Sequence, residues 1–110
     1  MDVDFATGDL AKLCNNARHA DRKLGAMSAR KLRSRLADIE AARNVAELVA
    51  GRPHPLKGNR VGDFSVRLHG GHRLVFRPDH YPPPKHAGGG IDWHSVTAVR
   101  IVQIGDYNAK

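Results

Sequence analysis

The sequence lacks the features on which disulfide-rich and membrane proteins depend. Cys14 is the single cysteine, so no internal disulfide can form and nothing points to an oxidising compartment. No apolar run approaches the ~18 residues of a membrane span, and no segment combines a basic start, an apolar run and a small-residue cleavage site. These absences predict a cytoplasmic protein that makes no membrane contact.

Acidic residues are also scarce, because 11 Asp and Glu face 18 Lys and Arg and leave a formal net charge of +7. Residues 22–37 contain six basic residues and no acid, and residues 52–77 contain six more with only Asp63 against them. Such clusters favour a polyanionic partner. For the first cluster alone, a solvated helix face is an equally good interpretation.

The first half of the chain predicts a strand followed by two helices. Val3 and Phe5 alternate with aspartates, as in a short strand with one apolar face. Thr7 can cap a helix that ends at Gly25. The second helix has its apolar residues at helical spacing, namely Ala29, Leu32, Leu36 and Ile39.

Three segments predict turns and loops instead. Asn44 followed by Glu47 resembles a capping box, so we expect one further short turn there. Residues 51–58 hold too much Pro and Gly for regular structure and predict a rigid loop. Residues 78–94 contain three consecutive prolines and three consecutive glycines, which predict an exposed loop.

The remaining segments predict strands. Residues 64–68 and 73–77 are β-prone runs joined by paired glycines, a pattern typical of a hairpin. Residues 95–107 are apolar at both odd and even positions, which fits a central strand covered on both sides. Because the chain has the commonest size of one domain, we expect residues 1–110 to form a single domain.

The order of these elements, with five short motifs, resembles the HigB-like killer toxins of the RelE/ParE toxin superfamily. The motifs are the basic helix at 29–36, His-Pro-Leu-Lys-Gly at 54–58, the hairpin strands at 64–67 and 73–76, and Val-Gln-Ile-Gly-Asp-Tyr at 102–107. Together they cover nearly the whole chain in the family's order. The resemblance implies an α+β, RelE-like fold in which an N-terminal strand and a helical hairpin pack on a small antiparallel sheet.

The resemblance also implies a function. It is that of a toxin of a type II toxin–antitoxin system, a ribosome-dependent and metal-independent messenger RNA endoribonuclease that inhibits translation. The implied partners are the ribosome with its messenger RNA and a cognate antitoxin of the helix-turn-helix type, with operator DNA bound only through the antitoxin complex. No metal and no cofactor are implied. The family's cleft residues correspond here to His54, Arg73, Asp106, Tyr107 and Asn108, where Asn108 takes the place of a family His.

These residue types suit RNA cleavage without a metal, which needs a base, an acid and a cation beside the phosphorus. Histidine is the side-chain type best suited to proton transfer near neutral pH, and His54 lies between two prolines, so it is a candidate base or acid. Arg73 can present a guanidinium to a phosphate in fixed geometry, and Tyr107 can stack on a base. Four further cations are candidate RNA contacts, namely Lys57, Arg67, Arg30 and Arg33.

Each candidate has a simpler structural alternative. His54 fits an ordinary loop histidine, and Arg67 or Arg73 could pair with Asp63 or Asp106 on the sheet surface. Tyr107 could be an aromatic at the edge of the core, and Asp106 could only end a strand. The seven histidines form no known metal-ligand pattern. Trp93 fits a loop anchor, and Cys14 fits a core position better than a nucleophile.

Two alternatives to the nuclease remain at the level of function. One is a module of the same fold that binds RNA or the ribosome with impaired chemistry, which the amide of Asn108 favours because it cannot exchange a proton near neutral pH. The other is a ParE-like toxin that acts on DNA gyrase, in which case the cleft residues would be incidental.

Overall fold

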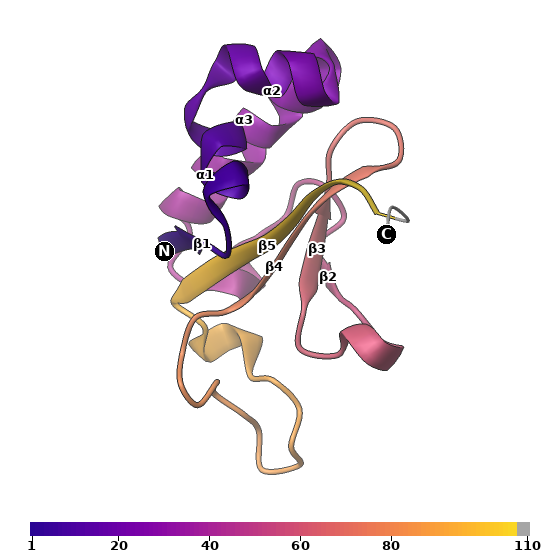
Figure 1. Ribbon diagram of the computed structural model, residues 1–110. Helices are drawn as coiled ribbons and strands as arrows, with labels where there is room; N and C mark the ends of the chain where they lie inside the picture. The colour runs from indigo at the N-terminus through magenta and orange to yellow at the C-terminus, as the bar shows by residue number, and fades with distance from the viewer. Residues whose placement is uncertain (108–110) are drawn as a thin grey trace.

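A computed structural model describes residues 1–107 and shows three helices gathered on one side of a five-stranded sheet (Figure 1). The sheet has the order β1-β5-β4-β3-β2. Its strands are β1 (Asp2–Phe5), β2 (His54–Pro55), β3 (Phe64–Arg67), β4 (His72–Pro78) and β5 (Ala98–Asp106). The predicted α+β class is confirmed.

The sheet is antiparallel except at one edge, where β1 runs parallel to β5. The helices carry the chain from the β1 edge to the β2 edge, and the chain then returns through antiparallel neighbours until β5 lies beside β1. The expected small antiparallel sheet is formed by β2, β3, β4 and β5, and β1 joins its edge in parallel.

The helices are α1 (Gly8–Asn15), α2 (Ala17–Leu24) and α3 (Ala26–Ala41). The predicted cap at Thr7 and the end at Gly25 are confirmed, with Thr7 Oγ1 accepting from the Leu10 amide and Gly25 at φ 83°. The single helix expected between them is wrong. Asn16 is extended there, and its side chain accepts from the His19 amide to begin α2, because a short polar side chain competes well for free backbone donors.

The core lies between α3 and the sheet. The four predicted apolar residues of α3 are all buried. Phe76 of the sheet is buried as well and belongs to the same core. Trp93 packs tilted against Phe64, with ring centroids 4.9 Å apart, so the predicted anchor of the 78–94 segment is confirmed. This packing excludes water from one face of the sheet and leaves the other face for charged side chains.

Three local predictions need correction. The 51–58 segment is not wholly irregular, because β2 forms within it. The predicted capping box does not form, since Glu47 accepts from the Arg43 amide at 2.7 Å while Asn44 makes no cap hydrogen bond. The last strand begins at Ala98 rather than residue 95, and several of its central residues are only half-buried. The hairpin between β3 and β4 is confirmed.

Within residues 1–107, none of the helices combines the length and the apolar character that crossing a membrane would demand.

Candidate functional site

On the face of the sheet away from the helices, directly paired residues of neighbouring strands form rows across the sheet. These rows bring together residues that are distant in the sequence. Leu74 and Phe76 point into the core, so Arg73 and Arg77 on the same strand point to the opposite face. Directly paired residues of neighbouring strands share a face. We call this side of the sheet the arginine face, defined by Arg67, Arg73, Arg77 and Arg100.

The central row of the arginine face crosses four strands. His54 pairs with Ser65, Ser65 with Val75, and Val75 with Gln103. The adjoining row contains the direct pair of Arg67 and Arg73. His54 and both candidate arginines therefore project from the same face in neighbouring rows, although up to 19 positions separate them in the sequence.

A pocket of about 520 Å³ opens at this end of the face and is lined by Arg52, Pro53, His54, Arg67 and Arg73. We call this the His54 end. Among the described residues, no ion pair involves any of its three arginines. The alternative in which Arg67 or Arg73 pairs with Asp63 is therefore wrong, because the carboxylate of Asp63 pairs with two other arginines.

The backbone around His54 selects the tautomer of its ring. Nδ1 lies 2.8 Å from the carbonyl oxygen of Arg52, and because a carbonyl can only accept, Nδ1 must donate. The neutral ring then keeps its lone pair on Nε2. The preceding turn is held by Gly51, whose carbonyl accepts from the Arg67 amide at 2.7 Å. At φ 85°, with a Cβ that would lie 2.5 Å from Arg35 Nε, Gly51 has little freedom to be another residue.

Two polar atoms in these rows are buried without a hydrogen-bond partner in the described chain. They are the hydroxyl oxygen of Ser65, a fully buried residue, and Nη1 of Arg73. Buried polar groups are nearly always satisfied in folded proteins, and leaving one unmet costs about 1–3 kcal/mol. Arg73 lines the pocket, whereas Ser65 pairs with His54 in register but is not among the lining residues.

Tyr107 lies at the edge of this end, near two guanidinium groups. The Cζ atoms of Arg60 and Arg73 each lie 5.8 Å from the centroid of its ring, within cation–π range. Arg60 also donates through Nη1 to Gln103 at 3.0 Å, and Gln103 donates to the carbonyl of Asp106. Arg60 thus reaches across the sheet from its loop and orders the end of β5.

The opposite end of the arginine face is built around a buried carboxylate. Asp63 is only 6% exposed and accepts from Arg60 Nε at 3.1 Å and from Arg77 Nε at 3.2 Å. Arg100 forms ion pairs with Asp4 and Asp79, at 3.2 and 3.6 Å. We call this the Asp63 end, and its arginines are neutralised where those of the His54 end are not.

The other predicted site residues are dispersed. Asp106 pairs with His72 in register and lines a separate pocket beside Lys23, on the helical side of the sheet. Lys57 is exposed next to the 3-10 helix Gly58–Arg60. Arg30 and Arg33 are exposed on α3, the helix that packs on the opposite face of the sheet from His54. The structure gives no account of Asn108, which lies outside the described residues.

Three residues of this site escaped sequence reasoning, namely Arg60, Ser65 and Gln103. Arg60 belongs to the basic 52–77 segment, but nothing local distinguishes it from its neighbours. Ser65 and Gln103 gave a weak signal as polar residues inside otherwise apolar strands, and pairing of the strands is needed to show that they share a row.

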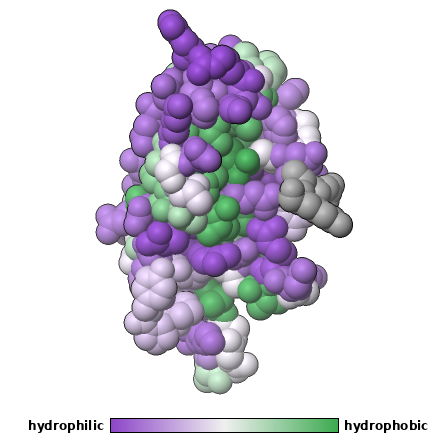
Figure 2. Space-filling view, viewed as in Figure 1, coloured by the Kyte–Doolittle hydropathy of each residue, from purple (hydrophilic) through white to green (hydrophobic). Residues whose placement is uncertain are grey.

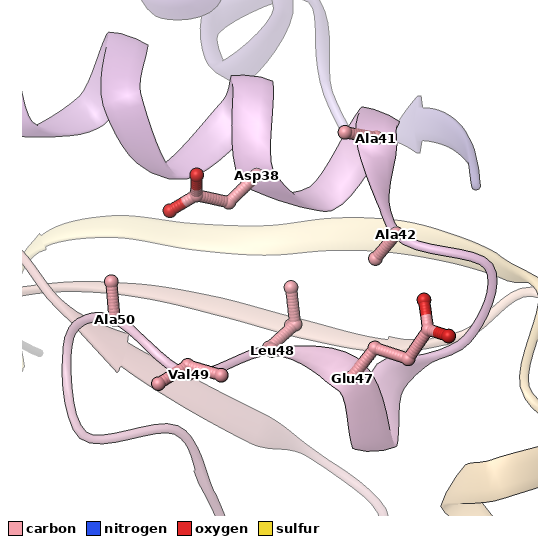
Figure 3. A pocket seen from close by; sticks show the side chains of 7 residues that line it. All are labelled: Asp38, Ala41, Ala42, Glu47, Leu48, Val49 and Ala50. Carbon is pink, nitrogen blue, oxygen red and sulfur yellow. The ribbon is translucent and has the colours of Figure 1, made fainter.

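A hollow beside α3 differs from the His54 end in the side chains that line it. It lies between the end of α3 and residues 47–50, with Ala41, Ala42, Leu48 and Ala50 around it and the carboxylates of Asp38 and Glu47 toward its two ends (Figure 3). It holds no cation among its lining residues. More broadly, the side of the molecule shown in Figure 2 mixes hydrophobic areas with hydrophilic ones, so an apolar lining alone does not single out a site.

The remaining interpretations concern Cys14 and metal ions. Burial, aided by the charge of Glu40, raises the pKa of the Cys14 thiol to about 12, so it stays protonated and packs as an apolar side chain. Within residues 1–107, no group of three His, Cys, Asp or Glu side chains is placed to hold a metal ion.

Comparison with known proteins gives a fold likeness without a sequence match. No family model and no curated protein matches the chain. A YoeB/ParE toxin from Agrobacterium tumefaciens has a TM-score of 0.60 at 17% identity, over 97% of this chain and 99% of that one. The YoeB dimer from Staphylococcus aureus has a TM-score of 0.59 at 17% identity, over 99% and 98% of the two chains. The YoeB–YefM complex from the same organism has a TM-score of 0.60 at 20% identity, over 99% and 98%.

The chain therefore has the fold of YoeB/ParE-type toxins, which confirms the predicted RelE-like architecture. The HigB-like subtype remains a prediction from the sequence.

Proposed function

We propose that this protein is the toxin of a toxin–antitoxin pair and that it cleaves messenger RNA on the ribosome at the His54 end of the arginine face. The observation that carries the proposal is the pocket that joins His54 to uncompensated arginines and an unpartnered buried Nη1. Phosphate oxygens suit this lining, because guanidinium groups bind them with paired hydrogen bonds. The fold likeness to YoeB/ParE toxins supports the same conclusion.

In the proposed reaction, the 2′-hydroxyl of the RNA attacks the adjacent phosphorus and the 5′-oxygen leaves. His54 Nε2 carries the lone pair and is the group suited to take or return a proton. Arg73 and Arg67 balance the charge that develops on the phosphorane oxygens. Tyr107, held by Arg60 and Arg73, offers a ring for a neighbouring base.

A protein partner fits this proposal, because one of the similar folds was solved as a YoeB–YefM complex. We propose that an antitoxin neutralises the activity, and that operator DNA is bound only by the joint complex.

The test is a map of messenger RNA ends by primer extension after brief induction of the protein. New ends within translated frames, lost in Arg73→Ala, are the expected result. If DNA breaks linked to gyrase appear instead, with no new RNA ends, the protein acts on gyrase.

Asn108 favours a second candidate, in which the same face binds RNA without cleaving it. The amide can hydrogen-bond but cannot serve as acid or base near neutral pH. If Asn108 stands where a proton donor is required, Asn108→His should raise cleavage of a translated message at least roughly tenfold, the low end of one acid or base. RNA affinity should stay nearly unchanged. Equal rates for the parent and the variant would show that this position has no catalytic role.

A further inference from the structure

A second pocket lies at the Asp63 end of the arginine face, where the 78–94 segment meets the loop before β3. Its volume is about 360 Å³, and Asn59, Arg60, Asp63, Arg77, Tyr81 and Pro83 are among its lining residues. The proposed cleavage chemistry uses neither this pocket nor the long 78–94 segment. Yet Arg77, which lines this pocket, projects from the same face of the sheet as His54.

The electrostatics of this pocket differ from those of the His54 end. Two arginines and one aspartate line it, and both arginines, Arg60 and Arg77, pair with the carboxylate of Asp63. Each guanidinium thus already has a carboxylate partner, so a phosphate gains less by entering here than at the His54 end. An uncharged group with a flat apolar surface and polar edges fits this lining better.

Tyr81 supplies the flat surface. It is 80% exposed, an unusual state for a large aromatic residue, and Pro83 lies on the same pocket wall. Its side chain lies near enough to Arg100 to raise the pKa of that guanidinium, and the charge of Asp79 adds to the effect. The ring thus lies beside the arginine face and leaves its surface open for stacking.

Polar groups for the edge of a ligand are present as well. Arg77 donates to Asp63 through Nε, but its side chain remains 53% exposed, so its terminal nitrogens can reach a further acceptor. The exposed Asn59 adds an amide that both donates and accepts. Donors and acceptors around an aromatic surface are what recognition of an unstacked nucleobase uses.

Arg60 connects the two pockets. It lines the second pocket and also lies over the ring of Tyr107 at the His54 end. Along β4, the four residues from Arg73 to Arg77 correspond to about 13 Å. A single RNA strand bound at the His54 end can therefore continue along the face without leaving it.

We propose that the pocket of Tyr81, Arg77 and Asn59 is a nucleobase subsite that holds one unpaired base of the RNA strand bound at the His54 end. This inference rests on the proposed function and extends it. Tyr81 stacks on the base, and Arg77 and Asn59 contact its edge. The phosphates remain with the arginines of the His54 end.

The test uses the full chain and a fluorescent single-stranded RNA that is 2′-O-methylated throughout, so that no 2′-hydroxyl can attack. Tyr81→Ala should weaken binding roughly 5- to 150-fold, the range expected for one base–aromatic stack. Tyr81→Phe should restore most of the affinity. Val49→Ala is the matched control, because Val49 is 86% exposed but lines the separate hollow beside α3.

Two further measurements identify the ligand as a base. An abasic nucleotide placed at each position in turn should weaken parent binding at one position, and Tyr81→Ala should add nothing to the loss at that position. The slope of log affinity against log salt should be the same for Tyr81→Ala and the parent, whereas Arg73→Ala should flatten it by about 0.7.

The outcomes separate this inference from the proposed function. Parent-like RNA affinity in Tyr81→Ala, with weakened binding in Arg73→Ala, would overturn the subsite and leave the cleft intact. A flattened salt slope in Tyr81→Ala would also overturn it, because the residue would then act on phosphate. If the parent bound no RNA, or Arg73→Ala bound as the parent does, the proposed function itself would fail.

Discussion

Arg73 and Arg77 lie four residues apart on β4 and project from the same face of the sheet, yet their surroundings differ. Arg77 donates to the buried carboxylate of Asp63, as does Arg60. Arg73 has no ion pair among the described residues and keeps a buried Nη1 without a hydrogen-bond partner. Of two arginines on one strand, Arg77 thus has a carboxylate partner within the protein, whereas Arg73 keeps a buried nitrogen without a hydrogen bond.

This difference separates structural arginines from ligand-binding ones. An arginine that is paired with a buried carboxylate stabilises the folded state. Removing it leaves the carboxylate buried without a partner, which is destabilising. An uncompensated arginine beside a pocket contributes little to folding and keeps its hydrogen-bonding capacity for a bound anion. Residue type and exposure alone do not make this distinction, whereas the partners of each guanidinium do.

The largest expected effect concerns cleavage by variants of the two arginines. Arg73→Ala should lower the cleavage rate of a translated message about 10²- to 10³-fold, the usual cost of removing one preorganised donor to transition-state charge. Arg77→Ala, at the compensated end, should lower it less than tenfold. Equal losses of activity in the two variants, both folded by circular dichroism, would contradict the distinction between the two ends of the arginine face.

A smaller effect is expected when the compensation itself is removed by Asp63→Asn. The free energy of unfolding should fall by roughly 1–3 kcal/mol, because Asp63 loses two charge-assisted hydrogen bonds in a buried site. The freed Arg60 and Arg77 should then bind phosphate and steepen the salt dependence of RNA affinity. Urea unfolding and binding titrations measure the two parts. A less steep salt dependence in this variant would contradict the assignment of the two ends.

Salt dependence gives a still smaller but selective effect. Arg67→Ala and Lys57→Ala should each flatten the plot of log RNA affinity against log salt by about 0.7, since one phosphate contact is lost from a single strand. Arg77→Ala should leave the slope unchanged. An unchanged slope in either of the first two variants would exclude that residue from the phosphate-binding surface.

The smallest effect on stability is expected at Ser65. Its hydroxyl is buried without a partner, so Ser65→Ala should change the free energy of unfolding by no more than about 0.5 kcal/mol or even raise it. RNA affinity should fall nonetheless if the hydroxyl is kept for a ligand. A clear loss of stability in Ser65→Ala, with unchanged affinity, would show that the group serves the fold.

Much of the helical half was predictable because its signals are local. Thr7 and Gly25 satisfy backbone groups at the two ends of the α1–α2 segment, and the apolar stripe of α3 needs only helical periodicity. The break at Asn16 was missed because the residues on both sides of it continue the helical pattern. The cap at Glu47 was missed because its partner is the amide of Arg43, one position earlier than the capping-box pattern requires.

The sequence by itself determined the basic composition, the α+β order of the elements and the residue types that the site has available. Only the tertiary structure decided which of them meet. His54 joins Arg67 and Arg73 because β2 pairs with β3 in one particular register, and a shift by one residue would turn each side chain to the other face. It also decided that Asp63 compensates Arg60 and Arg77 rather than Arg67 and Arg73, since a charge is neutralised by its neighbours in space and not in sequence.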